Sequence, residues 1–93
     1  MKGSMKFKYR KSMNLPRRRQ EKIYCLCQSI NHLPEKERQR IRQACDNTGV
    51  GDAVYEYITT DATSMYICDN YYISHTLLAV KTAEAFRELA KNL

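Results

Sequence analysis

The chain has 93 residues, of which 43% are hydrophobic and 28% charged, and its formal net charge at pH 7 is +6. This length allows one small domain with a single modest core, and the scarcity of Gly (3) and Pro (2) favours helices over a turn-rich β fold. No apolar stretch approaches the roughly 18 residues that a membrane helix needs, and no apolar run follows the basic N-terminus as it would in a signal peptide.

The positive charge is concentrated at one end of the chain. Residues 1–22 hold nine Lys or Arg and one acid, a net +8, whereas residues 23–93 hold seven bases and nine acids, a net −2. A basic segment of this kind neutralises phosphates and releases counterions, so we expect an acidic partner, with duplex DNA first. A solubilising tail is the alternative. Residues 1–4, which precede a second methionine, look like a cloning remnant.

Residues 5–15 are expected to form a basic N-terminal arm. Basic and aromatic or apolar side chains alternate over residues 5–14, which is compatible with a short strand, an arm that orders on a partner, or disorder. The phosphate contacts expected in this arm and just after it are Lys6, Lys8, Arg10, Lys11, Arg17, Arg18, Arg19 and Lys22.

The helical domain is predicted over residues 16–93. Apolar side chains at three-four spacing predict a first helix from residue 16 or 17 to about 31, although its first turns carry three arginines at the positive end of the helix dipole. Pro34 is expected to begin a second helix over 35–47, whose thin apolar face places it on the outside. Gly49 suits a left-handed cap before a third helix over 53–59.

The last third of the chain predicts two helices joined by a tight turn. The first covers about 63–71, with Asp61 or Thr63 as its N-cap, and the second runs from a Ser74 cap to about Asn92. Spacing predicts a small internal core under the turn, made of Ile67, Cys68, Tyr71, Ile73 and Leu78. The expected fold is therefore all-α, with about five short helices and a C-terminal helix-turn-helix at about 63–92.

This arrangement resembles the helix-turn-helix in the C-terminal, promoter-reading domain of bacterial sigma factors and in small phage or mobile-element regulators. Those proteins carry a small residue after an aliphatic one in the first helix, as Cys68 follows Ile67 here, and Gly-Val-Ser at the turn, where this chain has Tyr72-Ile73-Ser74. The segment Leu33-Pro34-Glu35-Lys36-Glu37-Arg38 resembles the start of the preceding helix in sigma factors. The resemblance covers about Leu33–Leu93.

The resemblance implies DNA binding in transcription regulation and a contact with RNA polymerase or another nucleoprotein complex. It places Ser74, His75 and Thr76 near the groove. Because Tyr72 stands where the family has glycine, the backbone of this tyrosine is expected to adopt a strained, left-handed conformation.

One pattern favours a different function. From Ala44 to Val80 there is no Lys or Arg, while five acids occur there, and a recognition helix usually carries Arg, Lys, Asn or Gln for base edges. The alternative is a protein-interaction module, or a phage-type inhibitor, that binds an acidic surface of a nucleic-acid-handling complex. Tyr55, Tyr66 and Tyr72 cannot all be buried, so some of them are expected to cover a partner or a second copy of the chain, which leaves a homodimer open.

No pattern in the sequence predicts catalysis, a metal or a cofactor. Cys25 and Cys27 are two residues apart on a predicted helix and point to opposite faces, unlike the paired ligands of a zinc site. Cys27, Cys45 and Cys68 fit small buried positions, and four cysteines without an export signal predict reduced thiols in the cytoplasm. His32 and His75 have no serine, cysteine or carboxylate partner in a catalytic pattern.

Overall fold

The computed structural model describes residues 7–91, and this part of the chain is all-α, which confirms the predicted fold class. The five α-helices are α1 (Arg17–Gln28), α2 (Glu35–Asp46), α3 (Gly51–Thr59), α4 (Ser64–Tyr71) and α5 (His75–Ala90). Two 3-10 turns, η1 (Lys11–Met13) and η2 (Ile30–His32), flank α1. Among these residues no helix is both long and apolar enough to cross a membrane.

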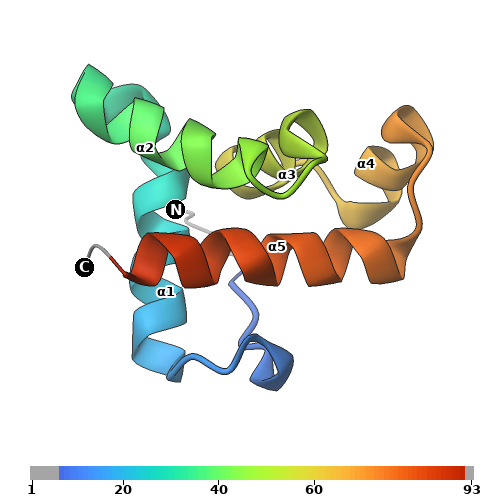
Figure 1. Ribbon diagram of the computed structural model, residues 1–93, viewed down its shortest axis with the longest axis horizontal. Helices are drawn as coiled ribbons and strands as arrows, with labels where there is room; N and C mark the ends of the chain where they lie inside the picture. The colour runs from blue at the N-terminus through green and yellow to red at the C-terminus, as the bar shows by residue number, and fades with distance from the viewer. Residues whose placement is uncertain (1–6, 92–93) are drawn as a thin grey trace.

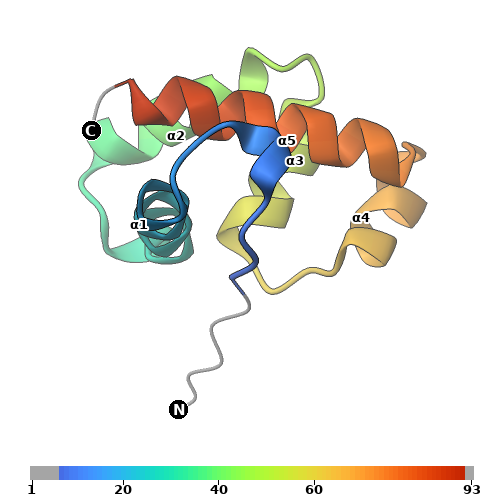
Figure 2. The same ribbon diagram turned by 90° about the horizontal axis from the view of Figure 1, so that it is seen from below.

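Helix α5 is the element on which the others pack (Figure 1). It contacts α1, α2, α3, α4 and η1. Figures 1 and 2 agree that α1 crosses near its C-terminal end, whereas α4 lies near its N-terminal end. The buried side chains of α5 include Leu78, Thr82, Phe86 and Leu89, whose three-four spacing forms one stripe along the helix. Helix α5 therefore lies between α1 and α4, and both of these helices pack against it.

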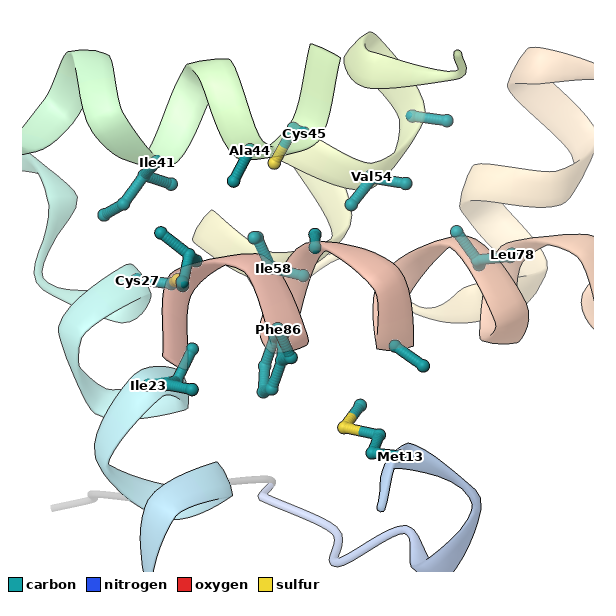
Figure 3. Close-up of a cluster of buried hydrophobic side chains, with 14 of the residues drawn as sticks. Met13, Ile23, Cys27, Ile41, Ala44, Cys45, Val54, Ile58, Leu78 and Phe86 are labelled. Atoms are coloured by element: carbon teal, nitrogen blue, oxygen red, sulfur yellow. The ribbon is translucent and has the colours of Figure 1, made fainter. Parts of the chain in front are cut away.

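The core is filled from each helix by the apolar positions that the sequence predicts. Ile23 and Cys27 of α1 are fully buried, as are Val54 of α3 and Ile67 of α4. In Figure 3, Ile41, Ala44 and Cys45 project from α2 toward α5. Burying a side chain the size of isoleucine stabilises the fold by roughly 1.5–3 kcal/mol.

The cysteines occupy the positions expected from their spacing. Cys27, Cys45 and Cys68 are buried, whereas Cys25 is exposed on the other face of α1. Burial raises the pKa of the Cys45 thiol to about 12 and also raises the pKa of Cys27. These two thiols are therefore kept in the protonated, unreactive form.

The helix ends follow the predicted caps with two small differences. Gly49 has a φ of 87° and ends the α2 turn in the left-handed region, as expected. Helix α1 ends at Gln28 rather than near residue 31, because the N–H of Ser29 bonds both the Cys25 and Leu26 carbonyls and the chain tightens into η2. Helix α3 starts at Gly51, two residues earlier than predicted; a Cβ at this glycine would lie 2.9 Å from the Asp46 Cα, so only glycine fits.

The segment before α1 is held on the domain. In place of the strand considered for this segment, its described part contains η1, and Met13 is buried with only 3% of its surface exposed. Arg87 of α5 donates a hydrogen bond to the Met13 carbonyl (3.3 Å). The proposed remnant at residues 1–4, Lys6 and the expected helix end at Asn92 lie outside the described residues.

Candidate nucleic-acid interface

The connection between α4 and α5 is a three-residue turn, Tyr72-Ile73-Ser74, closed by backbone hydrogen bonds. Tyr72 has φ 56° and ψ 45°, the left-handed conformation expected for this position. Its N–H and that of Ile73 both donate to the Cys68 carbonyl, the latter at 3.3 Å. This is the glycine-type ending of a helix built with a tyrosine, and it fixes the angle at which the chain enters α5.

The side chains under this turn form the predicted internal core. Ile67 and Leu78 are 0% and 1% exposed. Cys68 is also buried, and Ile73 is half-buried. Tyr71 is also half-buried, and its hydroxyl donates a 2.7 Å hydrogen bond to Glu56 of α3, which raises the pKa of Tyr71. The turn is thus tied both to its own two helices and to α3.

The first turn of α5 brings together the three residues expected near a groove. Ser74 is the N-cap, and its Oγ accepts the N–H of Leu77 at 3.0 Å, as predicted. His75 and Thr76 follow on the exposed surface. Thr63 caps α4 in the same way, accepting the N–H of Tyr66 at 3.1 Å. The Ser74 Oγ accepts the cap bond and its O–H can still donate, so Ser74, His75 and Thr76 all present side-chain groups that are open to a ligand.

Three large side chains of α4 and of the turn after it are exposed, and we call Met65, Tyr66 and Tyr72 the aromatic face. Their exposed fractions are 66%, 52% and 93%. The third tyrosine considered for a partner contact, Tyr55, is instead half-buried, with the Arg42 guanidinium 5.0 Å from its ring centroid. The predicted excess of exposed tyrosine is therefore confirmed for Tyr66 and Tyr72.

The charge near the aromatic face is acidic. Arg42, the last cation before the gap that ends at Lys81, forms ion pairs with Asp46 (3.1 Å) and with Asp52. Lys81 lies 3.4 Å from Glu84. The two cations that flank this segment in the sequence, Arg42 and Lys81, are thus already paired with carboxylates.

The basic residues of α1 form a second, separate group. Arg17, Arg18 and Lys22 are exposed, and we call them the basic cluster. The first turn of α1 contains no acid and no side-chain cap, so positive charges accumulate at the positive end of the helix dipole. Arg17 lies over the Phe7 ring, with 5.8 Å between its guanidinium carbon and the ring centroid. An anion at this helix end would relieve the repulsion.

Of the other residues expected to contact phosphates, two arginines form hydrogen bonds within the domain and two lysines are exposed. Arg19 donates to the Ala90 carbonyl at the end of α5 (3.3 Å), and Arg10 donates to the Tyr57 hydroxyl (3.3 Å). Lys8 and Lys11 are exposed, and Lys6 lies outside the described residues. Arg19 acts as a C-terminal cap of α5, where a cation is favourable for the helix dipole.

The basic cluster and the N-terminus of α5 lie far apart in the structure. Arg19 marks the C-terminal end of α5 through its bond to Ala90, while Ser74 precedes the first residue of the same helix. Sixteen residues at 1.5 Å each make α5 about 24 Å long. Figure 1 shows α1 and α4 near opposite ends of α5 accordingly. The basic cluster and the α5 N-terminus are therefore not parts of one compact site.

Two polar side chains within the described helices, those of Gln20 and Thr82, are buried although the sequence did not predict it. Gln20 is fully buried: its Oε1 accepts the Arg10 N–H (3.0 Å), and its Nε2 donates to the Arg10 and Leu15 carbonyls (2.8 and 2.9 Å). Thr82 is 4% exposed and lies on the α5 stripe between Leu78 and Phe86. In both cases the available signal was a polar residue at an apolar position of the helical spacing.

Within residues 7–91, no three His, Cys, Asp or Glu side chains are grouped so that they could hold a metal ion. Cys25 and Cys27 face opposite sides of α1, as their spacing predicts.

Comparisons with known proteins give no further assignment. No protein-family model, curated protein or solved structure matches this chain. The resemblance to sigma-factor and phage-regulator motifs therefore rests on the sequence of this chain alone, at Leu33–Arg38, Ile67-Cys68 and Tyr72-Ile73-Ser74.

Proposed function

We propose that the chain is a small DNA-binding regulator in which α4 and α5 act as a helix-turn-helix. The observation that carries this proposal is the three-residue turn with its left-handed Tyr72 and its Ser74 cap, which leaves the outer surface of the first α5 turn exposed. A recognition helix contacts base edges with its N-terminal residues, which here are His75 and Thr76. An imidazole and a hydroxyl can each bond a base edge or a phosphate.

The basic cluster would supply phosphate contacts at a distance from the groove. Helix α5 is about 24 Å long and separates the cluster from His75 and Thr76. Contacts to phosphates fix position and strength without reading sequence. Affinity and discrimination are thus assigned to opposite ends of α5.

Fluorescence anisotropy with a 25-base-pair duplex of random sequence tests the affinity term. The double variant Arg17→Ala/Arg18→Ala should flatten the plot of log affinity against log salt by about 1.8, since each lost phosphate contact removes about 0.9. The matched control Lys36→Ala/Arg40→Ala removes the same charge from α2 and should leave the slope unchanged. An unaltered slope in the arginine variant, or an absence of binding at low salt, would contradict the proposal.

Selection of preferred duplexes from the random pool tests the discrimination term. His75→Ala/Thr76→Ala should lower the preference for the selected site over random DNA by about 1–3 kcal/mol per base contact, while the salt slope stays that of the wild type. A variant that weakens all duplexes equally would place these side chains on phosphates rather than bases.

The aromatic face favours a second candidate function, a protein-interaction module. Met65, Tyr66 and Tyr72 are exposed beside Asp69, without a Lys or Arg between Ala44 and Val80. Exposed aromatic side chains of this kind are enriched in protein interfaces. Recovery of a defined host protein in a pull-down that withstands nuclease, and is lost in Tyr66→Ser, would support this candidate. Sedimentation of the purified chain distinguishes a second copy from a foreign partner.

A further inference from the structure

A cavity of about 400 Å³ lies beside α5, and its lining contains no residue of the first α5 turn. The cavity borders the basic cluster, because Arg17 lies over the lining residue Phe7, and it borders the aromatic face, because the lining residue Ser64 precedes Met65. Its lining comes from the segment before α1, from α1, from α3 and the loop after it, from the first residue of α4, and from α5. This volume falls within the range of small-molecule sites in proteins, and such sites combine apolar walls with a few placed polar groups.

The floor of this cavity includes a buried hydroxyl whose hydrogen-bonding capacity is unused. Thr82 lines the cavity, is 4% exposed, and its Oγ1 has no hydrogen-bond partner among the described residues. A threonine inside a helix commonly bonds a carbonyl of the preceding turn, and this one does not. An unsatisfied buried hydroxyl is unfavourable, so a ligand atom that bonds the Thr82 Oγ1 would remove that cost.

The walls are aromatic and aliphatic. Phe7, Tyr24, Ile58 and Phe86 line the cavity. The Phe7 and Tyr24 rings are 5.7 Å apart between centroids and tilted by 54°. Flat apolar groups pack well against such surfaces, because aromatic rings favour offset or tilted contacts at these distances.

The charged groups of the lining are two cations and one carboxylate: Lys8, Arg10 and Asp61. Arg10 is placed firmly, since its backbone N–H and carbonyl are both bonded to the buried Gln20. Its guanidinium donates to Tyr57, which also lines the cavity, and a guanidinium has five N–H donors in all. The balance of charge favours an anionic ligand.

We propose that this cavity binds a small organic anion with a flat, apolar body. The body packs between the aromatic walls, the anionic group meets Lys8 and Arg10, and a polar atom of the ligand bonds the Thr82 hydroxyl. This proposal does not rest on DNA binding by α5.

The probe for the test is 8-anilinonaphthalene-1-sulfonate, and its comparison compound is N-phenyl-1-naphthylamine, the same skeleton without the sulfonate. Titration calorimetry on the full chain should give one site per chain for the sulfonate and an affinity at least about tenfold lower for the neutral compound, because a charge-assisted hydrogen bond contributes about 1.5–3 kcal/mol.

Variants place the probe in the cavity. Lys8→Ala and Thr82→Val should each weaken binding of the sulfonate about fivefold, while Thr82→Ser, which keeps the hydroxyl, should bind like the wild type. Lys36→Ala on α2 is the control for a lost surface charge, and Tyr66→Ser is the control for dye bound to the aromatic face; both should leave the affinity unchanged. Circular dichroism checks that each variant is folded.

Two results would overturn the proposal. One is equal affinity for the charged and the neutral compound, which would remove the case for an anion site. The other is unchanged sulfonate binding in both Lys8→Ala and Thr82→Val, or loss of binding in Tyr66→Ser alone, which would place the dye elsewhere.

Discussion

Replacing Tyr72 by glycine should stabilise the protein. Tyr72 has φ 56°, a region that costs an L-residue about 1–2 kcal/mol and costs glycine nothing. Glycine loses about 0.5–1 kcal/mol more conformational entropy on folding, which offsets part of the gain. The ring itself is 93% exposed, so its removal sacrifices little packing. The expected net gain is about 0.5–1 kcal/mol, equivalent to roughly 2–8 °C in melting temperature for a domain of this size.

Tyr72→Ala is the matched control for this change. Alanine also removes the ring but keeps a Cβ at positive φ, so it should stay within about 0.5 kcal/mol of the wild type. Thermal unfolding followed by circular dichroism, together with urea unfolding at 25 °C, measures all three proteins. If Tyr72→Gly were no more stable than Tyr72→Ala, the left-handed backbone would not be a source of strain. A clear gain would mean that the tyrosine is retained at this position at a cost in stability.

Three further outcomes are expected from buried or exposed side chains. Gln20→Leu should lower the free energy of unfolding by about 2–3 kcal/mol in urea, because three hydrogen bonds to the segment before α1 are lost; a near-neutral change would refute the anchoring role. Ellman's reagent should label one thiol per native chain rapidly, that of Cys25, and the other three only after unfolding; rapid labelling of all four would contradict the burial. The folded state raises the pKa of Cys45 from 9.0 to about 12, so the stability that depends on the neutral thiol is complete below about pH 9 and is lost between pH 9 and pH 12. The urea midpoint of Cys45→Ala should therefore fall less steeply with alkaline pH than that of the wild type. An identical fall in both proteins would count against Cys45 as the cause.

The helices were predictable because their signals are local. Ser74 and Thr63 precede apolar spacing and accept the expected N–H groups three residues later. Gly49 and Pro34 mark ends and starts that the backbone confirms. Each of these features depends on residues within one helical turn, so no knowledge of the tertiary fold is needed to infer them.

The use of individual charged and polar residues was much harder to predict. Arg19 directly follows Arg18 in the sequence, yet it caps a carbonyl 71 residues away, at Ala90. Gln20 fixes a backbone segment ten residues earlier. Such partners are set by which elements meet in three dimensions. Local spacing therefore predicts that a side chain is buried or exposed, but not the group with which it pairs.

If the chain binds DNA, the distance between the basic cluster and the α4–α5 turn limits which cations can help His75 and Thr76 to bind. If His75 and Thr76 enter a groove, the nearby cations give little help, since Arg42 is paired with Asp46 and Asp52, and Lys81 with Glu84. Electrostatic attraction would then come from exposed cations of the N-terminal part of the chain, Lys8, Lys11 and the basic cluster. Because such cations contact phosphates and not bases, they would raise affinity without adding discrimination. A regulator built in this way needs a second source of specificity, and the aromatic face lies beside the turn where a protein partner or a second copy would supply it. The two candidate functions are thus compatible: one chain that holds DNA through α1 and α5 can be directed to its site through Tyr66 and Tyr72.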